Sequence, residues 1–172
     1  MLAAVLALAS SLSWGLSDFV GGLQSRRHAL LAVLVLSQGF ALVLLVAAIA
    51  AGAPTEHDAS ATAWAVGAGI VDVVGVTAFY RALAIGTMSI VAPLSATGAV
   101  IPVLVGLASG ERPRTLQLVG MALAMVGVVL VGREAAEPDA EARRTGRTAV
   151  LLALLAAVGF GSFFAGMDRA EE

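Results

Sequence analysis

Two carboxylates fall inside long apolar stretches of the sequence, where a charged group needs a chemical reason to be present. Asp18 lies in GLSDF, and Asp72 lies in GIVDV. A carboxylate at membrane depth is costly unless it is hydrated, paired or protonated. Asp18 lies about five residues from the end of its stretch, so it could serve a function or simply reach the interface beside Arg26. Asp72 lies mid-stretch, and we expect it to bind a cationic substrate or carry a coupled proton.

Other polar and aromatic side chains could line a path with these acids. Trp14 shares a helical face with Asp18, and Phe79 shares one with Asp72, because residues three, four or seven apart lie on the same side of a helix. Pro93 and Pro102 lack a backbone donor and can kink a helix, which exposes carbonyl groups; a passive kink is equally compatible with the pattern. The candidate pathway or coupling residues are Trp14, Asp18, Gln38, Asp72, Tyr80, Pro93 and Thr97.

Each of the remaining candidates also has a structural interpretation. Gln38 could bond a substrate or a neighbouring helix, and Thr97 could satisfy carbonyls freed by Pro93. Tyr80, near the end of its stretch, is typical of an interfacial anchor. His28 and His57 are isolated, and the chain has no cysteine, so we expect no metal site and no cofactor. No G-x-x-x-x-G-K-[ST] sequence is present, so the sequence does not indicate ATP as the energy source.

The composition indicates that a membrane surrounds these residues. The chain has 172 residues, of which 59% are hydrophobic and 13% charged, with a mean hydropathy of +0.95. Soluble domains carry about 25% charged residues. The net charge of -2 excludes a basic nucleic-acid-binding domain. The expected partners are therefore the lipid bilayer and a small-molecule substrate, with no nucleic acid.

Six apolar segments are each close to the length that crosses a bilayer as a helix, which is about 20 residues. The sequence therefore predicts an all-α, polytopic membrane protein with about six transmembrane helices. The segments are Leu2–Leu23, Leu30–Ala51, Ala61–Tyr80, Met88–Ala108, Leu116–Gly132 and Thr148–Met167. The one long connection, residues 133–147, has four acids and four arginines and should be solvated.

A repeat relates the last segment to the first. An offset of 146 residues places Phe160 on Trp14 and Gly161 on Gly15, together with several matched alanines and leucines. Five segments precede the linker, and an odd number of crossings places the linker on the opposite side of the membrane from the N-terminus. A second unit that starts there would therefore lie inverted relative to the first. We expect a first unit at residues 1–132, a linker at 133–147, and the first helix of a second unit at 148–172.

The chain resembles the drug/metabolite transporter superfamily, specifically its EamA-type members, over residues 2–132 as one complete repeat and over 148–172 as the opening of a second. The resemblance rests on ALASSLSWGLSDF at 7–19, on YRALAIGT at 80–87, on Ala-Pro-Leu at 92–94, on Gly-Glu-Arg at 110–112, and on the glycine pattern after Gln117. It implies a carrier of ten helices in two inverted five-helix repeats. Since this sequence carries one helix of the second repeat, we expect a truncated product, or a half that recruits another chain or a second copy.

The resemblance implies a secondary transporter, an exporter or permease that moves small metabolites or drug-like compounds across a bacterial-type cytoplasmic membrane by alternating access. Coupling to protons at Asp72 is a hypothesis within this interpretation. One alternative is an inactive or accessory fragment that needs a second half. Another is an intramembrane aspartyl protease with Asp18 and Asp72 as its dyad, although neither acid has the Tyr-Asp or Gly-x-Gly-Asp context of those enzymes.

The arginines and the resemblance disagree about orientation. With a cytoplasmic N-terminus, as the resemblance implies, the outer connections hold seven arginines and the inner ones only Arg112, Arg114 and Arg169. The positive-inside rule favours the opposite orientation. We adopt the orientation of the family. Single cysteines introduced into residues 24–29 and 133–147 should then react with a membrane-impermeant thiol reagent on intact cells, and labelling only after lysis would support the arginine count instead.

Overall fold

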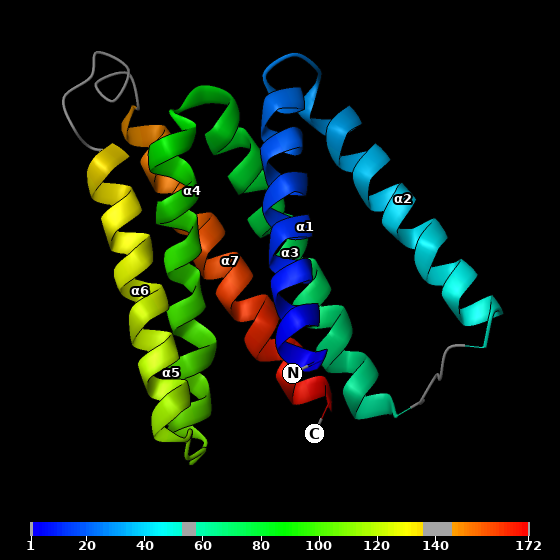
Figure 1. The fold of residues 1–172 in the computed structure, drawn as a ribbon. Coiled ribbons are helices and arrows are strands. Elements are labelled where there is room, and N and C mark those ends of the chain that lie inside the picture. The colour runs from blue at the N-terminus through cyan, green and yellow to red at the C-terminus, as the bar shows by residue number, and fades with distance from the viewer. Residues whose placement is uncertain (1, 53–57, 136–145, 172) are drawn as a thin grey trace.

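The computed structural model describes residues 2–52, 58–135 and 146–171 of the chain. Over these residues every regular element is a helix, and successive helices alternate in direction along the chain, except that α4 and α5 continue each other as one interrupted segment (Figure 1). They are α1 (Leu2–Ser25), α2 (Leu30–Ala50), α3 (Ala59–Ile85), α4 (Met88–Ala96), the short 3-10 turn η1 (Thr97–Ala99), α5 (Val100–Ala108), α6 (Thr115–Ala135) and α7 (Arg147–Glu171). The all-helical fold class expected from the sequence is confirmed.

Four of the described segments are long and apolar enough to cross a membrane: α2, α3, the combined α4–η1–α5, and α7. The apolar part of α6 is shorter, Thr115–Val131, while α1 has sufficient length but carries serines and Asp18 that reduce its hydropathy. The predicted linker at 133–147 falls mostly outside the described residues. Its first three residues continue α6 to Ala135, because a helix that leaves the membrane can extend with its backbone hydrogen bonds intact.

Helix α7 lies at the centre of the bundle and packs mainly against α3, with further contacts to α4, η1 and α5. Its contact face consists of small residues: Ala149, Ala153 and Ala156 are each at most 1% exposed. Where α7 crosses α3, a Cβ atom placed on Gly159 would lie 2.6 Å from the Cα of Gly75. Small residues let helix backbones approach in a bilayer, where apolar side chains gain little over lipid. The centre of the bundle is therefore a contact of backbones.

The fourth predicted segment is interrupted, as its prolines indicated. Helix α4 contains Pro93 and ends at Ala96, η1 follows, and α5 carries Pro102 in its first turn. The Thr97 hydroxyl donates to the Leu94 carbonyl at 2.6 Å. The backbone of Gly98, within η1, lies so close to Ala157 that a side chain there would collide with α7. The interruption therefore lies directly against the central helix.

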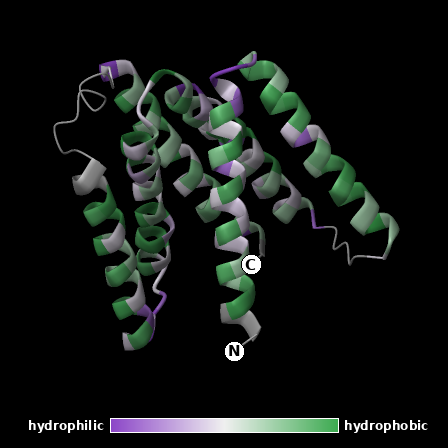
Figure 2. Cartoon of the chain, turned by 45° about the horizontal axis from the view of Figure 1, so that its top comes forward, coloured by the Kyte–Doolittle hydropathy of each residue, from purple (hydrophilic) through white to green (hydrophobic). Residues whose placement is uncertain are grey.

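Helix α2 has no buried residue and leans away from the other helices (Figure 1). Its surface is hydrophobic almost throughout (Figure 2), and its mean hydropathy as a candidate span is 2.6. A helix that is apolar on all sides and has few protein neighbours suits a lipid environment. We therefore interpret α2 as a peripheral, lipid-facing helix.

The contact between Gly75 and Gly159 predicts a large cost for any added side chain. We expect Gly159→Val to lower the free energy of unfolding by about 1–3 kcal/mol or more, because overpacking must push α7 away from α3. The matched control is Gly120→Val in α6, since a Cβ there meets no atom within 4 Å. Thermal unfolding in detergent, followed by circular dichroism, measures both. Equal midpoints for the two variants would contradict the proposed role of this contact.

Candidate functional site

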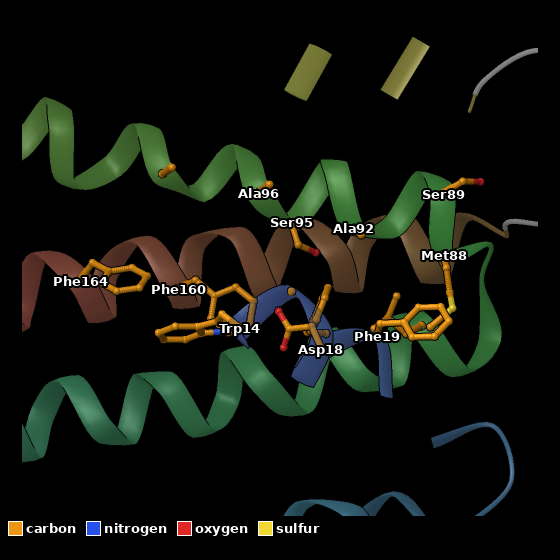
Figure 3. Close-up of a pocket in the computed structure, with 14 residues that line it drawn as sticks. Trp14, Asp18, Phe19, Met88, Ser89, Ala92, Ser95, Ala96, Phe160 and Phe164 are labelled. Carbon is orange, nitrogen blue, oxygen red and sulfur yellow. The ribbon is translucent and has the colours of Figure 1, made fainter. Parts of the chain in front are cut away.

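A cavity of about 650 Å³ lies among α1, α3, α4 and α7 (Figure 3). This volume is in the range of sites that hold small organic molecules, about 300–1,000 Å³. Most of its wall is apolar, and its polar groups come from one acid and two serines. The lining residues are Trp14, Gly15, Asp18, Phe19, Phe79, Leu83, Met88, Ser89, Ala92, Ser95, Ala96, Ala99, Phe160 and Phe164.

Asp18 is the only ionisable side chain among the residues that line this cavity. Figure 3 shows its carboxylate pointing into the space bordered by Trp14, Ser95 and Phe160. Ser95 is buried and donates to the carbonyls of Val91 at 3.0 Å and Ala153 at 3.3 Å, which joins α4 to α7 at the cavity wall. The cavity thus presents a single carboxylate in otherwise apolar surroundings.

Five aromatic residues line the cavity, and four of them, from three helices, meet in two pairs. Trp14 of α1 contacts Phe164 of α7 with ring centroids 5.8 Å apart, and Phe79 of α3 meets Phe160 of α7 edge to face at 5.5 Å. The sequence repeat aligned Trp14 with Phe160, and the structure brings both to the same cavity. Phe160 and Phe164 were absent from our list of pathway candidates, although the repeat already marked Phe160 as the counterpart of Trp14.

Asp72 lies on α3 and is not among the residues that line the cavity. Its helix contacts α1, which carries Asp18. The two acids singled out from the sequence therefore lie on adjacent helices, but only Asp18 lines the cavity. The mid-span position of Asp72 sets its depth in the membrane and does not determine which way its side chain faces.

Tyr80 differs from the interfacial anchor that its sequence position indicated. It is 6% exposed, and its ring packs over Gly21 of α1. It lines a second cavity between α1 and α2 together with Gln24 and His28. The residue points inward because α1 crosses α3 at a glycine, which leaves room for the ring.

The other candidates lie away from the main cavity. Gln38 is exposed on α2, Pro93 lines a groove between α4 and α6, and Thr97 bonds back to its own helix. Among the described residues there is no group of three or more His, Cys, Asp or Glu side chains that could hold a metal ion. Of the seven candidate pathway residues named from the sequence, Trp14 and Asp18 line the cavity.

The Arg26 side chain forms hydrogen bonds with carbonyl groups at the end of α3. The sequence had suggested Asp18 as its partner, on the assumption that Asp18 reaches the membrane interface. The Nε of Arg26 donates to the Leu83 carbonyl at 2.9 Å, and its Nη2 donates to the Gly86 carbonyl at 2.7 Å. The last carbonyls of a helix lack partners and carry partial negative charge, so a guanidinium there is stabilising. Arg26 therefore fastens the end of α1 to the end of α3.

The absence of native cysteine allows a direct test of the cavity. We expect Ala96→Cys, on the cavity wall, to react rapidly with a small water-soluble thiosulfonate, because thiolate forms only where water reaches the sulfur. Val91→Cys, in the fully buried core, and Leu42→Cys, on the lipid-facing α2, should react at least tenfold more slowly. Mass spectrometry of the labelled protein in nanodiscs gives the rates. Equal rates at the three positions would show that the cavity is closed to water.

The comparison with protein families agrees with this architecture. No curated protein and no solved structure matches the chain. The model of the EamA-like transporter family matches residues 1–133, which includes α1 to α5 and nearly all of α6. The match covers well over half of the chain and includes Trp14, Asp18, Phe79 and Ser95 of the cavity. The protein is a multi-pass membrane protein that belongs to the EamA-like transporter family.

Proposed function

We propose that the protein is a secondary transporter that moves small organic molecules across the cytoplasmic membrane by alternating access, with the cavity at Asp18 as its substrate site. The observation that carries the proposal is a single carboxylate in a cavity of about 650 Å³ among membrane-spanning helices. Ionisable groups inside a membrane protein usually mark substrate or ion pathways, because their burial is otherwise unfavourable. Membership of a transporter family supports the same conclusion.

Asp18 and Asp72 together offer a means of coupling. Two carboxylates that interact in a medium of low dielectric constant repel each other when both are ionised. Binding of a proton or a cation at either acid relieves this repulsion, so the two cargoes compete for the same charge. Such competition is what an exchanger needs in order to release one cargo when it takes up the other.

The helix breaks supply a place where the structure can bend. Alternating access requires some helices to move against others around the substrate site. The 3-10 turn at Thr97–Ala99 lies beside the cavity, since Ala99 is one of its lining residues. Because α4 and α5 are separate helices joined there, α5 can tilt while α4 stays attached to α7 through Ser95.

A second unit would complete the carrier. Helix α1 leaves Leu8, Leu12 and Leu16 more than 60% exposed, and α7 runs opposite to α1, as the first helix of an inverted unit should (Figure 1). We propose that further helices of a second repeat cover this side of α1. The protease alternative is not proposed, because the chain belongs to a family of transporters.

Proton movement in proteoliposomes tests the proposal. Vesicles that contain the protein and the pH-sensitive dye pyranine are given a gradient of one probe at a time: phenyltrimethylammonium, phenylalanine or benzenesulfonate. We expect at least one probe to drive a change in internal pH that protein-free vesicles do not show. Asp18→Asn and Asp72→Asn should each reduce this signal at least tenfold, because asparagine keeps the volume and removes the exchangeable proton.

The control is Asp168→Asn, the same chemical change at an exposed acid near the end of α7. This variant should transport as the wild type does. If no probe moves protons, or if both Asp18→Asn and Asp72→Asn retain the full signal, proton-coupled transport through this cavity is wrong.

A further inference from the structure

The lining of the main cavity also indicates which class of molecule it holds. We propose that its substrate is an organic monocation with a flat apolar body, whose positive charge lies against Asp18 and whose body lies among the aromatic rings of Trp14, Phe79, Phe160 and Phe164. This inference rests on the proposed function, because it names the cargo of the same cavity.

The charges around the cavity favour a cation over an anion or a zwitterion. Asp18 is the only ionisable group in the lining, so a substrate carboxylate or phosphate would find no positive partner. Arg26 is not among the lining residues, and its Nε donates to the backbone carbonyl of the lining residue Leu83. Asp72 adds to the negative potential at Asp18. A buried carboxylate gains most from a counter-charge brought by the substrate.

The shortage of oxygen ligands favours an organic cation over an inorganic one. A calcium ion takes about 6–8 oxygen ligands, and magnesium retains several waters. The cavity offers the Asp18 carboxylate and the hydroxyls of Ser89 and Ser95, and Ser95 already donates to two carbonyls. A strongly hydrated ion would therefore lose more hydration free energy than it would gain from the few oxygen atoms of this cavity. A quaternary or aromatic ammonium ion holds water weakly and avoids that loss.

The aromatic rings that line the cavity form a surface that suits a flat organic cation. Trp14 lies next to Asp18 in Figure 3, with Phe160 and Phe164 on the facing helix, and Phe79 completes the group from α3. A cation within about 6 Å of an aromatic face is attracted by the ring quadrupole, and tryptophan is the strongest partner. The same rings provide flat apolar area for the rest of the molecule. The ring planes are inclined by 49° within the Trp14–Phe164 pair and by 75° within the Phe79–Phe160 pair.

The two tryptophans of the chain make a direct binding assay possible. Trp14 lines the cavity, while Trp64 is exposed near the start of α3 and is not a lining residue of that cavity. The full chain carrying Trp64→Phe, in nanodiscs, reports on the cavity through Trp14 alone. The probes are phenyltrimethylammonium and its neutral isostere tert-butylbenzene, which differ in charge and hardly in shape. The reverse variant, Trp14→Phe, retains only Trp64 and measures the signal caused by partition into lipid.

We expect phenyltrimethylammonium to change Trp14 fluorescence saturably, with an affinity at least tenfold above that of tert-butylbenzene. Asp18→Asn should remove this advantage, Asp18→Glu should restore part of it, and Asp168→Asn should leave it unchanged. The comparison of the two probes on the unaltered cavity remains decisive even where a variant at Asp18 folds poorly.

Equal affinity for the two probes, or an advantage for the cation that survives Asp18→Asn in folded protein, would overturn the assignment of a cationic substrate. Neither result would contradict transport, since benzenesulfonate or phenylalanine can still drive protons in vesicles. Conversely, saturable binding of the cation without proton movement by any probe would leave the substrate class standing and contradict the proposed transport.

Discussion

The rest of the bundle depends on the contact between the backbones of α3 and α7. Gly75 and Gly159 face each other with no space for a side chain, so the two helix axes lie closer than larger residues would allow. Dispersion contacts along the small-residue face of α7 then provide the packing energy that the hydrophobic effect does not supply within a bilayer. Alanines on either side of this point keep the approach close, and bulkier residues of α7 are directed sideways. Phe160, the next residue after Gly159, consequently reaches the cavity and meets Phe79.

The cavity is a consequence of this packing. Close approach is possible only along the line of small residues, so α1 and α4 contact the α3–α7 pair at its edges and leave space between them. Arg26 holds the end of α1 to the last turn of α3, and Ser95 holds α4 to α7. Both attachments involve residues of the cavity wall, Leu83 and Ser95. The hydrogen bonds of Arg26 and Ser95 hold the helices around the cavity in place. The 3-10 turn after α4 is a point of weaker helical structure in the same wall.

The environment of Asp18 links this geometry to function. A carboxylate in an apolar cavity is unfavourable until a positive charge or a proton binds beside it, so the site favours cations and protons over other ligands. Asp72, one helix away, strengthens the preference without entering the cavity. The aromatic residues contribute attraction that depends on charge but not on hydrogen-bond geometry. A site of this kind can accept molecules of different outline, provided that they carry a positive charge and apolar area.

The sequence by itself determined the helices, because the length of an apolar segment and the thickness of a bilayer decide them independently of neighbouring segments. It also located the interruption, since Pro93 and Pro102 remove backbone donors wherever they lie, and the repeat marked Trp14 and Phe160 as equivalent. Only the tertiary structure decided which residues meet. Helical periodicity shows that Trp14 and Asp18 share a face, but not that this face looks toward Phe160 while Asp72 is turned from the cavity. That choice, like the inward position of Tyr80 and the engagement of Arg26 with α3, follows from the rotation of each helix about its axis. The rotation is set by where glycine and alanine permit close approach between segments far apart in the chain.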